Sequence, residues 1–371
     1  MAIPLFDIHA PLRPLRDRLL EATARTLDGG AFILGPEVRA FEREFADYLG
    51  VKHVVGVANG TDALTIALRA MGVGPGDDVI VPSFTFYASA EAIPHAGATP
   101  VFCDVDPETF CITPETVKSV MTPRTKAVIA VHLFGNVAPV AEIEALGVPV
   151  LEDAAQAAGS RGPHGRPGAL GRAATFSFFP SKNLGCLGDG GAIATSDDAV
   201  AEMADILRFH GSRDRATWEY VGYNSRLDEM QAAYLRVLLP ELDSWSDGRV
   251  RAAGHYDAAG LGELVELPSP TEGARPAWHL YVIRSPHVDA IADALSRAQI
   301  GNKIYYRPPL HRHRAMLPYA DGVELPVTDE LALRHLAIAF NPRLSEADAA
   351  EVTQAVAGAL SAQGTAATSR G

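Results

Sequence analysis

The sequence predicts an α/β protein with a large domain, built on a seven-stranded and mostly parallel sheet, and a smaller α+β domain towards the C-terminus. Three observations predict this fold. Strand-like and helix-like segments alternate from about residue 51 to residue 209. Several strands are continuous apolar runs, such as 127–131, which is typical of a sheet buried on both faces. Beyond about residue 240 the elements follow a different order.

Two amphipathic helices are expected before the first strand. In 12–28 leucines recur at helical spacing, and Gly29 and Gly30 follow them. In 36–49 Pro36 suits the first turn of a helix and Gly50 ends it. Packing alone accounts for both helices.

The central part of the chain contains the strands of the expected sheet and the helices between them. Residues 59–62 separate the first strand from a helix that Gly72 ends. Strands are expected at 53–57, 78–81, 100–104, 126–131, 149–152, 174–178 and 191–194, and further helices at 85–96, 114–120, 139–146 and 197–209.

The C-terminal part is expected to form the second domain. We predict a large domain over 1–240, with a helical segment at 1–50, a small domain over 241–360, and a disordered tail at 361–371. Helices are expected at 225–239, 240–260, 288–298 and 346–360, and strands at 279–284 and 302–306.

Composition excludes several classes of protein. The formal net charge of −13 argues against a nucleic-acid partner, which would favour a basic face. Three cysteines without a CxxC pair indicate neither a disulfide framework nor a metal site. No apolar run of about 18 residues spans a membrane, and no signal peptide is visible, so a cytoplasmic protein is expected.

Lys182 is the first candidate for chemistry. It lies in the apolar and glycine-rich stretch 175–191, just after a strand-like run. Desolvation there lowers the pKa of the amine, which makes it a usable nucleophile toward an aldehyde. A surface-loop lysine is the alternative, and for a lysine taken alone it is the commoner case.

Two further stretches complement this lysine. Gly60 and Thr61 lie between a strand and a helix start, where unpaired N–H groups can hold a phosphate, although simple helix capping also explains them. Asp153 ends an apolar strand, at the edge where open α/β sheets bind ligands, and Gln156 follows three residues later. A helix cap is the alternative for Asp153.

Other patterns carry less information. The glycines at 72–77 follow a helix and precede a strand, which is the wrong order for a dinucleotide fingerprint, and those at 185–191 lack its spacing. His311 and His313 lack a further ligand cluster, so we predict no metal.

Together, the lysine, the phosphate cradle and the strand-end carboxylate are the parts that a pyridoxal phosphate site requires. The lysine forms a Schiff base, the carboxylate keeps the pyridine nitrogen protonated, and N–H and hydroxyl groups hold the phosphate.

At these residues the chain resembles the DegT/DnrJ/EryC1 family of sugar aminotransferases, a branch of the fold-type I pyridoxal phosphate enzymes. The resemblance includes Ala-Asn-Gly-Thr-Asp-Ala-Leu at 58–64 and Glu-Asp-Ala-Ala-Gln at 152–156. It covers nearly the whole chain through 4–5, 32–38, 58–64, 81–86, 101–110, 131–135, 152–156, 176–191, 222–227, 277–284 and 304–311.

The resemblance implies a role for each matching residue. Lys182 would bond the cofactor and move protons, Asp153 would pair with the pyridine nitrogen, and Gln156 would bond the ring hydroxyl. Phe86 would stack on the ring, and Asn224 would reach the phosphate bound by the partner subunit of a homodimer with shared sites. Gly60, Thr61 and Ser177 would hold the phosphate.

Departures from the family concern the substrate. Arg307 and His313 stand where relatives often have proline and glutamine, and Phe179 stands where several have tyrosine. Arg307 could contact a diphosphate or carboxylate, or be a surface arginine. The expected substrate residues are Phe179, Tyr305, Tyr306, Arg307 and His311.

The function that the resemblance implies is transfer of an amino group from L-glutamate, or a similar donor, to a keto group of a nucleotide-linked sugar. Two alternatives stay open: amination of a keto-cyclitol or related precursor, and a non-catalytic regulatory protein that binds the cofactor. Sugar dehydration is a third activity in the family, but its members carry histidine in place of the lysine, so Lys182 argues against it.

Overall fold

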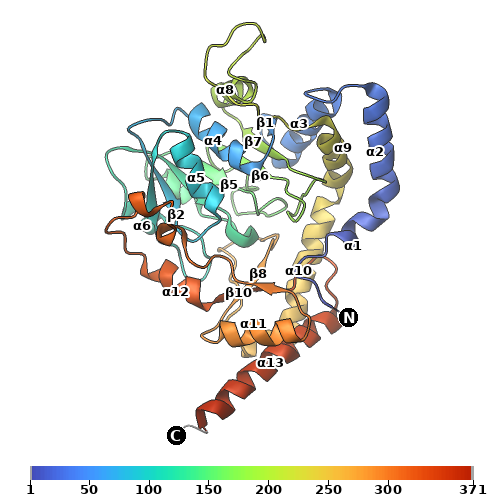
Figure 1. Cartoon of the computed structure of the whole chain (residues 1–371), viewed down its shortest axis with the longest axis vertical. Coiled ribbons are helices and arrows are strands. Elements are labelled where there is room, and N and C mark those ends of the chain that lie inside the picture. Colours follow the sequence, from blue (N-terminus) through green and yellow to red (C-terminus); the bar gives the residue numbers. More distant parts are fainter. Residues whose placement is uncertain (1, 369–371) are drawn as a thin grey trace.

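A seven-stranded sheet forms the centre of the large part of the molecule. The computed structural model describes residues 2–368 (Figure 1). The strand order is β1-β7-β6-β5-β4-β2-β3, and every pairing is parallel except those of β7 with β1 and β6. The predicted mostly parallel sheet is therefore confirmed. The strands are β1 His53–Val57, β2 Asp78–Pro82, β3 Thr99–Cys103, β4 Thr125–Val131, β5 Val150–Asp153, β6 Ala173–Ser177 and β7 Gly191–Thr195.

Helices cover both faces of this sheet, which is why its strands are apolar runs. Successive residues of a strand face opposite layers: Ile193 packs in the core beneath α4, α5 and α8, whereas Ala192 and Ala194 pack in the core beneath α2, α3 and α9. The helices are α1 His9–Leu12, α2 Arg16–Gly29, α3 Pro36–Leu49, α4 Gly60–Ala70, α5 Tyr87–His95, α6 Pro114–Lys118, α7 Val140–Glu144, α8 Asp198–Arg208 and α9 Glu229–Leu238.

The N-terminal helices differ in one respect from the prediction. The expected helix at 12–28 is divided into α1 and α2 by a short 3-10 turn that contains Pro14. Residue 36 begins α3 as predicted, and its first turn is capped by a buried carboxylate of α9. Glu229 accepts hydrogen bonds from the N–H groups of Gly35, Glu37 and Val38 at 2.6–2.9 Å.

The smaller part of the molecule contains an antiparallel three-stranded sheet in the order β8-β10-β9. Two of its elements, α12 and β10, were not predicted, because the helix and the strand meet at Arg334 and His335 with no glycine, proline or other turn residue between them. The elements are α10 Leu242–Ala258, β8 Tyr281–Arg284, α11 Val288–Arg297, β9 Asn302–Lys303, α12 Pro326–Arg334, β10 His335–Ile338 and α13 Glu346–Thr368.

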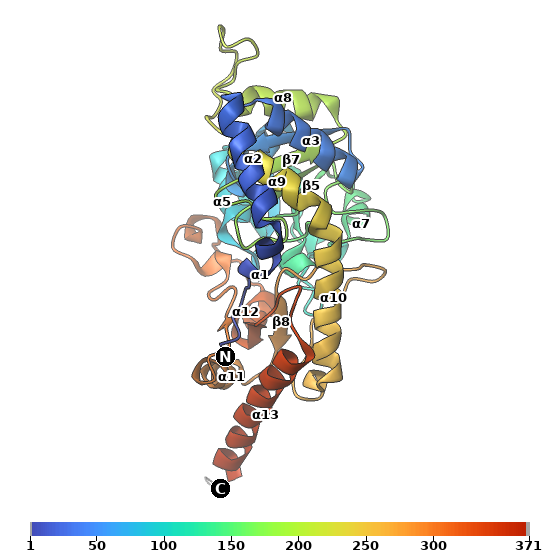
Figure 2. The ribbon, with the colours of Figure 1, turned by 90° about the vertical axis from the view of Figure 1, so that its right-hand side faces the viewer.

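Three boundaries differ from the sequence prediction. The strand expected at 302–306 ends at Lys303, because the next residues turn away from the sheet. Helix α13 runs to Thr368 and extends beyond the body (Figure 2), so 361–368 are helical; 369–371 of the expected tail lie outside the described residues. Ile3 and Leu5 hydrogen-bond to the smaller part rather than to the large one. The division into domains near residue 240 stays a prediction.

Among the described helices, none has both the length and the apolar character that crossing a membrane requires. Likewise, the described residues contain no group of three or more His, Cys, Asp or Glu side chains arranged to hold a metal ion.

A fully buried carboxylate fixes the end of β5, where the site forms. Glu152 receives a hydrogen bond from His132 Nε2 at 2.8 Å and from the N–H groups of Gly168, Leu170 and Gly171 at 2.8–2.9 Å. His132 Nδ1 accepts the N–H of Ala138, so its ring is the neutral Nε2–H tautomer. Glu152 thus ties two loops, the one after β4 and the one before β6, to the strand that carries Asp153.

Replacement of Glu152 by glutamine should destabilise the protein. The amide would set an N–H₂ group against backbone N–H donors, so we expect a loss of about 2–4 kcal/mol in the free energy of unfolding. Denaturant unfolding measures it. Glu142→Gln, at a half-exposed position, is the control, with a change of about 0.5 kcal/mol or less. Equal losses in both variants would contradict the role of Glu152.

Candidate active site

The main cavity, of about 660 Å³, opens at the carboxyl ends of β4, β5 and β6. Its walls come from both parts of the molecule, and it lies at the sheet edge where open α/β folds bind ligands. Ten of the predicted site residues line it: Gly60, Thr61, Phe86, Asp153, Gln156, Ser177, Phe179, Lys182, Tyr305 and Tyr306.

Lys182 reaches this cavity from a tight turn after β6. Its backbone N–H donates to the carbonyl of Phe179 at 2.8 Å, and the neighbouring Asn183 side chain donates to the carbonyls of Ala158 and Ala277 at 3.3 and 3.1 Å. At Gly185 an added Cβ would lie 2.6 Å from the carbonyl oxygen of Pro180, so only glycine allows this turn. The segment is therefore held in one conformation.

Desolvation dominates the electrostatics of Lys182. Burial of the amine lowers its pKa from 10.5 to about 8, and the carboxylate of Asp153 opposes this shift. About a tenth of the amine is therefore unprotonated at pH 7, far more than for an ordinary lysine, and the lowered pKa agrees with the sequence prediction. Such an amine can act as a nucleophile or accept a proton.

Asp153 and Gln156 are held in place by hydrogen bonds. Asp153 ends β5 and is buried; one carboxylate oxygen accepts from Ser89 Oγ at 2.7 Å and the other from the N–H of Ala155 at 3.2 Å. No helix follows it, so the helix-cap alternative is wrong. Gln156 Oε1 accepts the N–H of Phe134 at 2.7 Å, and its Nε2 donates to the hydroxyl of Tyr306 at 3.0 Å.

The opposite wall is the N-terminus of α4. Asn59 caps this helix by accepting the N–H of Asp62 at 2.8 Å, while the N–H groups of Gly60 and Thr61 donate to no residue that the structure describes. An added Cβ at Gly60 would lie 2.8 Å from Ser177 Cβ, so the helix end and the end of β6 are in contact. Helix capping and phosphate binding, the two alternatives for this turn, are therefore compatible, because they use different N–H groups.

Three predicted residues lie outside the cavity. Asn224 is exposed and belongs to a loop beside α8. Arg307 faces α11 and α12, where each of its three guanidinium nitrogens donates one hydrogen bond. His311 is buried between Ser83 Oγ, at 2.6 Å from Nδ1, and Asp329, at 3.3 Å from Nε2.

The structure adds residues that sequence reasoning did not assign. Phe6, Asp189 and His279 also line the cavity. The ring of His279 stacks on Phe6 at 5.7 Å, and burial, aided by the charge of Lys182, holds its pKa well below the ordinary value, so the imidazole is neutral. Trp278, just before it, has φ +39°, a strained conformation that could not be recognised in the sequence.

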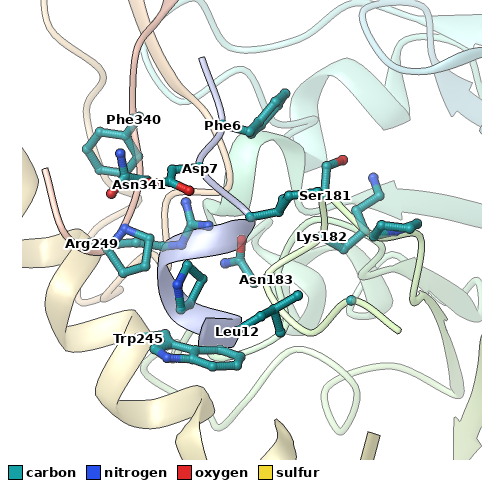
Figure 3. A pocket seen from close by; sticks show the side chains of 15 residues that line it. Phe6, Asp7, Leu12, Ser181, Lys182, Asn183, Trp245, Arg249, Phe340 and Asn341 are labelled. Atoms are coloured by element: carbon teal, nitrogen blue, oxygen red, sulfur yellow. The ribbon is translucent and has the colours of Figure 1, made fainter. Parts of the chain in front are cut away.

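A smaller cavity of about 40 Å³ adjoins the main one behind Lys182 (Figure 3). Ser181, Lys182 and Asn183 line one side, and Trp245 and Arg249 of α10 line the other. Arg249 is buried and donates to the carbonyl of Trp278 at 3.1 Å, and desolvation lowers its pKa to about 10. It braces the segment that carries His279.

A family model decides what kind of protein this is. The DegT/DnrJ/EryC1/StrS aminotransferase family matches residues 15–357. The chain belongs to this family. It is therefore an aminotransferase-family enzyme, and Lys182, Asp153 and the N-terminus of α4 lie together in the main cavity of an aminotransferase fold.

Curated relatives of this aminotransferase are similar over nearly their full lengths. The UDP-N-acetyl-3-dehydro-alpha-D-glucosamine 3-aminotransferase of Acidithiobacillus ferrooxidans is 44% identical over 359 residues, which cover 96% of this chain and 97% of the relative. A protein named pleiotropic regulatory protein, from Geobacillus stearothermophilus, is 42% identical over 366 residues, or 96% and 98% of the two chains.

Solved structures of aminotransferases share the fold. DesV of S. venezuelae, in complex with a ketimine intermediate, superposes with a TM-score of 0.92 at 41% identity, covering 96% of this chain and 97% of that one. NtdA of Bacillus subtilis, with bound cofactor PMP, gives 0.86 at 27% identity, covering 96% and 85%. The predicted family and fold are confirmed.

Replacing Lys182 by methionine should stabilise the cofactor-free protein in a pH-dependent way. Because the folded-state pKa of about 8 lies below the ordinary 10.5, the unfolded state binds more protons between these values. The free-energy cost of burying the protonated Lys182 amine therefore destabilises the protein fully below about pH 8. This cost disappears as the pH rises to 10.5.

Denaturant unfolding at a series of pH values measures this effect. The gain of Lys182→Met over wild type should be largest at pH 7 and vanish near pH 10.5. Lys126→Met, on an exposed lysine of β4, should show no such trend. A gain independent of pH would mean that the Lys182 amine is not desolvated.

Proposed function

We propose that this enzyme uses pyridoxal phosphate to transfer an amino group from L-glutamate to a keto group of a nucleotide-linked sugar. One observation carries the proposal: an amine with a lowered pKa shares a cavity with a buried carboxylate and a helix N-terminus with unused N–H donors. The relatives' names and the structure with bound PMP support it.

The residues present fit this cofactor. Gly60, Thr61 and Ser177 would hold the phosphate, because a helix N-terminus with free N–H groups favours a dianion. Asp153 would pair with the pyridine nitrogen, and Gln156 has a second Nε2 hydrogen available for the ring hydroxyl. Phe86, which is 55% exposed in the cavity wall, would cover one face of the ring.

When bound, pyridoxal phosphate supplies an aldehyde that carries the amino group between two substrates and a ring that withdraws electrons from the reacting carbon. The chain's own residues do the rest. Lys182 Nζ would hold the cofactor covalently at rest and move a proton at the reacting carbon of each substrate, for which a pKa of about 8 is suited. Phe179, Tyr305 and Tyr306 would orient the acceptor.

A homodimer with shared sites is part of the proposal. Among the described residues that line the cavity, Lys182 is the one strongly basic side chain, beside three aspartates, so a diphosphate needs cations from elsewhere. Near α8 a loop projects from the body (Figure 1), with Trp218 65% and Val221 85% exposed. A second copy would cover these apolar residues and bring Asn224 to its site. The expected cytoplasmic location stays a prediction.

Two other functions remain as alternatives. A keto-cyclitol or related precursor could replace the sugar as acceptor. The similarity to a protein named as a regulator favours, as a second candidate, a regulatory role. The complete set of side chains around Lys182 favours catalysis over it.

Turnover assays separate these functions. With L-glutamate as donor, nucleotide-linked keto-sugars should accept the amino group and keto-inositols should not. Lys182→Ala should still bind the cofactor but lose transfer by about 10³-fold or more, and borohydride reduction should fix the cofactor's mass on Lys182 in wild type alone. Full turnover by this variant would contradict the catalytic role assigned to Lys182.

Mixing two variants tests the shared site. Lys182→Ala and Asn224→Ala should each be weakly active as homodimers. A heterodimer of the two contains one site without either substitution, so mixed refolding should recover about a quarter of wild-type activity. If the mixture shows only the average of the two variants, Asn224 does not act on the partner's site.

A further inference from the structure

The side chains of the segment after β9 point in two directions, some into the main cavity and one away from it. It leaves the small sheet at Lys303 and carries Tyr305 and Tyr306 into the wall of the main cavity. The side chain of the next residue, Arg307, points away from the cavity towards α11 and α12. From the sequence alone, Arg307 could contact an anionic group of the substrate directly.

Outside the cavity, Arg307 ties this segment to two helices. Its Nε donates to the carbonyl of Ala332 at 2.9 Å and Nη2 to that of Leu333 at 3.1 Å, in the last turn of α12. Carbonyls there have no partner within the helix, and they attract a cation. Nη1 donates to Asp289 at 2.8 Å, in the first turn of α11. The planar fork of a guanidinium is needed to satisfy all three acceptors together.

Inside the cavity, Tyr306 continues this chain of contacts. Its hydroxyl accepts from Gln156 Nε2 at 3.0 Å, and Gln156 Oε1 accepts the N–H of Phe134 at 2.7 Å. The ring of Tyr306 stacks on Phe134, with centroids 6.3 Å apart and planes at 11°. Burial raises the pKa of Tyr306, so the phenol keeps its proton. That proton goes to no described residue and is free for a ligand oxygen.

We propose that Arg307 is a positioning residue for acceptor recognition. It fixes from outside the turn that presents Tyr305 and Tyr306 to the ring hydroxyls of the keto acceptor, and Tyr306 in turn orients Gln156. This inference rests on the proposed function and deepens it: acceptor binding depends on Arg307 without any contact between the arginine and the substrate.

The kinetic test compares four variants of the cofactor-loaded enzyme. Arg307→Ala removes the three contacts, Arg307→Lys keeps only the charge, and Asp289→Asn removes the exposed ion pair alone. Arg314→Ala is the matched control, because Arg314 is an exposed arginine on the same segment that contacts no described residue through a hydrogen bond or ion pair.

Kinetics should show that Arg307→Ala impairs the half-reaction with the keto acceptor and leaves the half-reaction with L-glutamate nearly unchanged. Arg307→Ala should raise KM for the acceptor about 10-fold, while the single-turnover rate with L-glutamate stays within about twofold, because Lys182 and Asp153 are untouched. Arg307→Lys should fail to restore KM, since a point charge cannot replace the fork. Asp289→Asn should change KM less than about twofold, because its carboxylate is exposed. Arg314→Ala should match wild type.

Binding of uridine diphosphate, measured by calorimetry, separates positioning from direct contact. Its affinity should be equal in wild type, Arg307→Ala and Arg307→Lys. A loss in Arg307→Ala that Arg307→Lys restores would overturn the proposal in favour of a charge contact to the diphosphate. An unchanged acceptor KM in Arg307→Ala would overturn it as well.

A spectroscopic readout keeps the inference independent of turnover. The visible circular dichroism of the bound cofactor should change in the same direction in Arg307→Ala and Tyr306→Phe, because both displace Gln156, and should not change in Arg314→Ala. Identical spectra in all variants would overturn the link from Arg307 to Gln156. If none of the acceptors received an amino group, the proposed function would be refuted. The comparison of circular dichroism spectra between the variants would still be interpretable.

Discussion

The desolvation of one amine is the constraint on which the rest of the site depends. An exposed lysine is almost fully protonated at neutral pH and can neither attack an aldehyde nor accept a proton. Lys182 differs because side chains from both parts of the molecule enclose its amine. This desolvation lowers the pKa of Lys182 to about 8. Asp153 limits the fall, so the same carboxylate that would pair with the cofactor also tunes the lysine.

The fold supplies this environment through its sheet edge. Buried hydrogen bonds at Glu152 fix the end of β5, and the turn after β6 admits no side chain at Gly185, so the carboxylate and the lysine project from rigid backbone. The smaller part closes the cavity with Tyr305, Tyr306 and His279. Rigid support on one side and a separately anchored wall on the other would allow acceptor specificity to vary without changes to the chemistry.

Much of this could be predicted from the sequence, for physical reasons that differ between elements. The strands were found because burial on both faces makes them continuous apolar runs, as at 127–131. Helix α12 and strand β10 were missed because they follow each other directly, with no turn residues between Arg334 and His335. The cavity residues follow from chemistry combined with the family resemblance, whereas Arg307 and His311, expected among the substrate residues, lie outside the cavity. Adjacency to Tyr306 does not tell which way a side chain points, and the strain at Trp278 has no sequence signature.

The most direct test is titration of the Lys182 amine by NMR. The chain has five lysines, Lys52, Lys118, Lys126, Lys182 and Lys303, so side-chain ¹³C labelling gives a spectrum in which Lys182→Met assigns the signal. In the cofactor-free protein we predict a midpoint near pH 8 for Lys182. A midpoint of 10 or above for Lys182 would contradict the account.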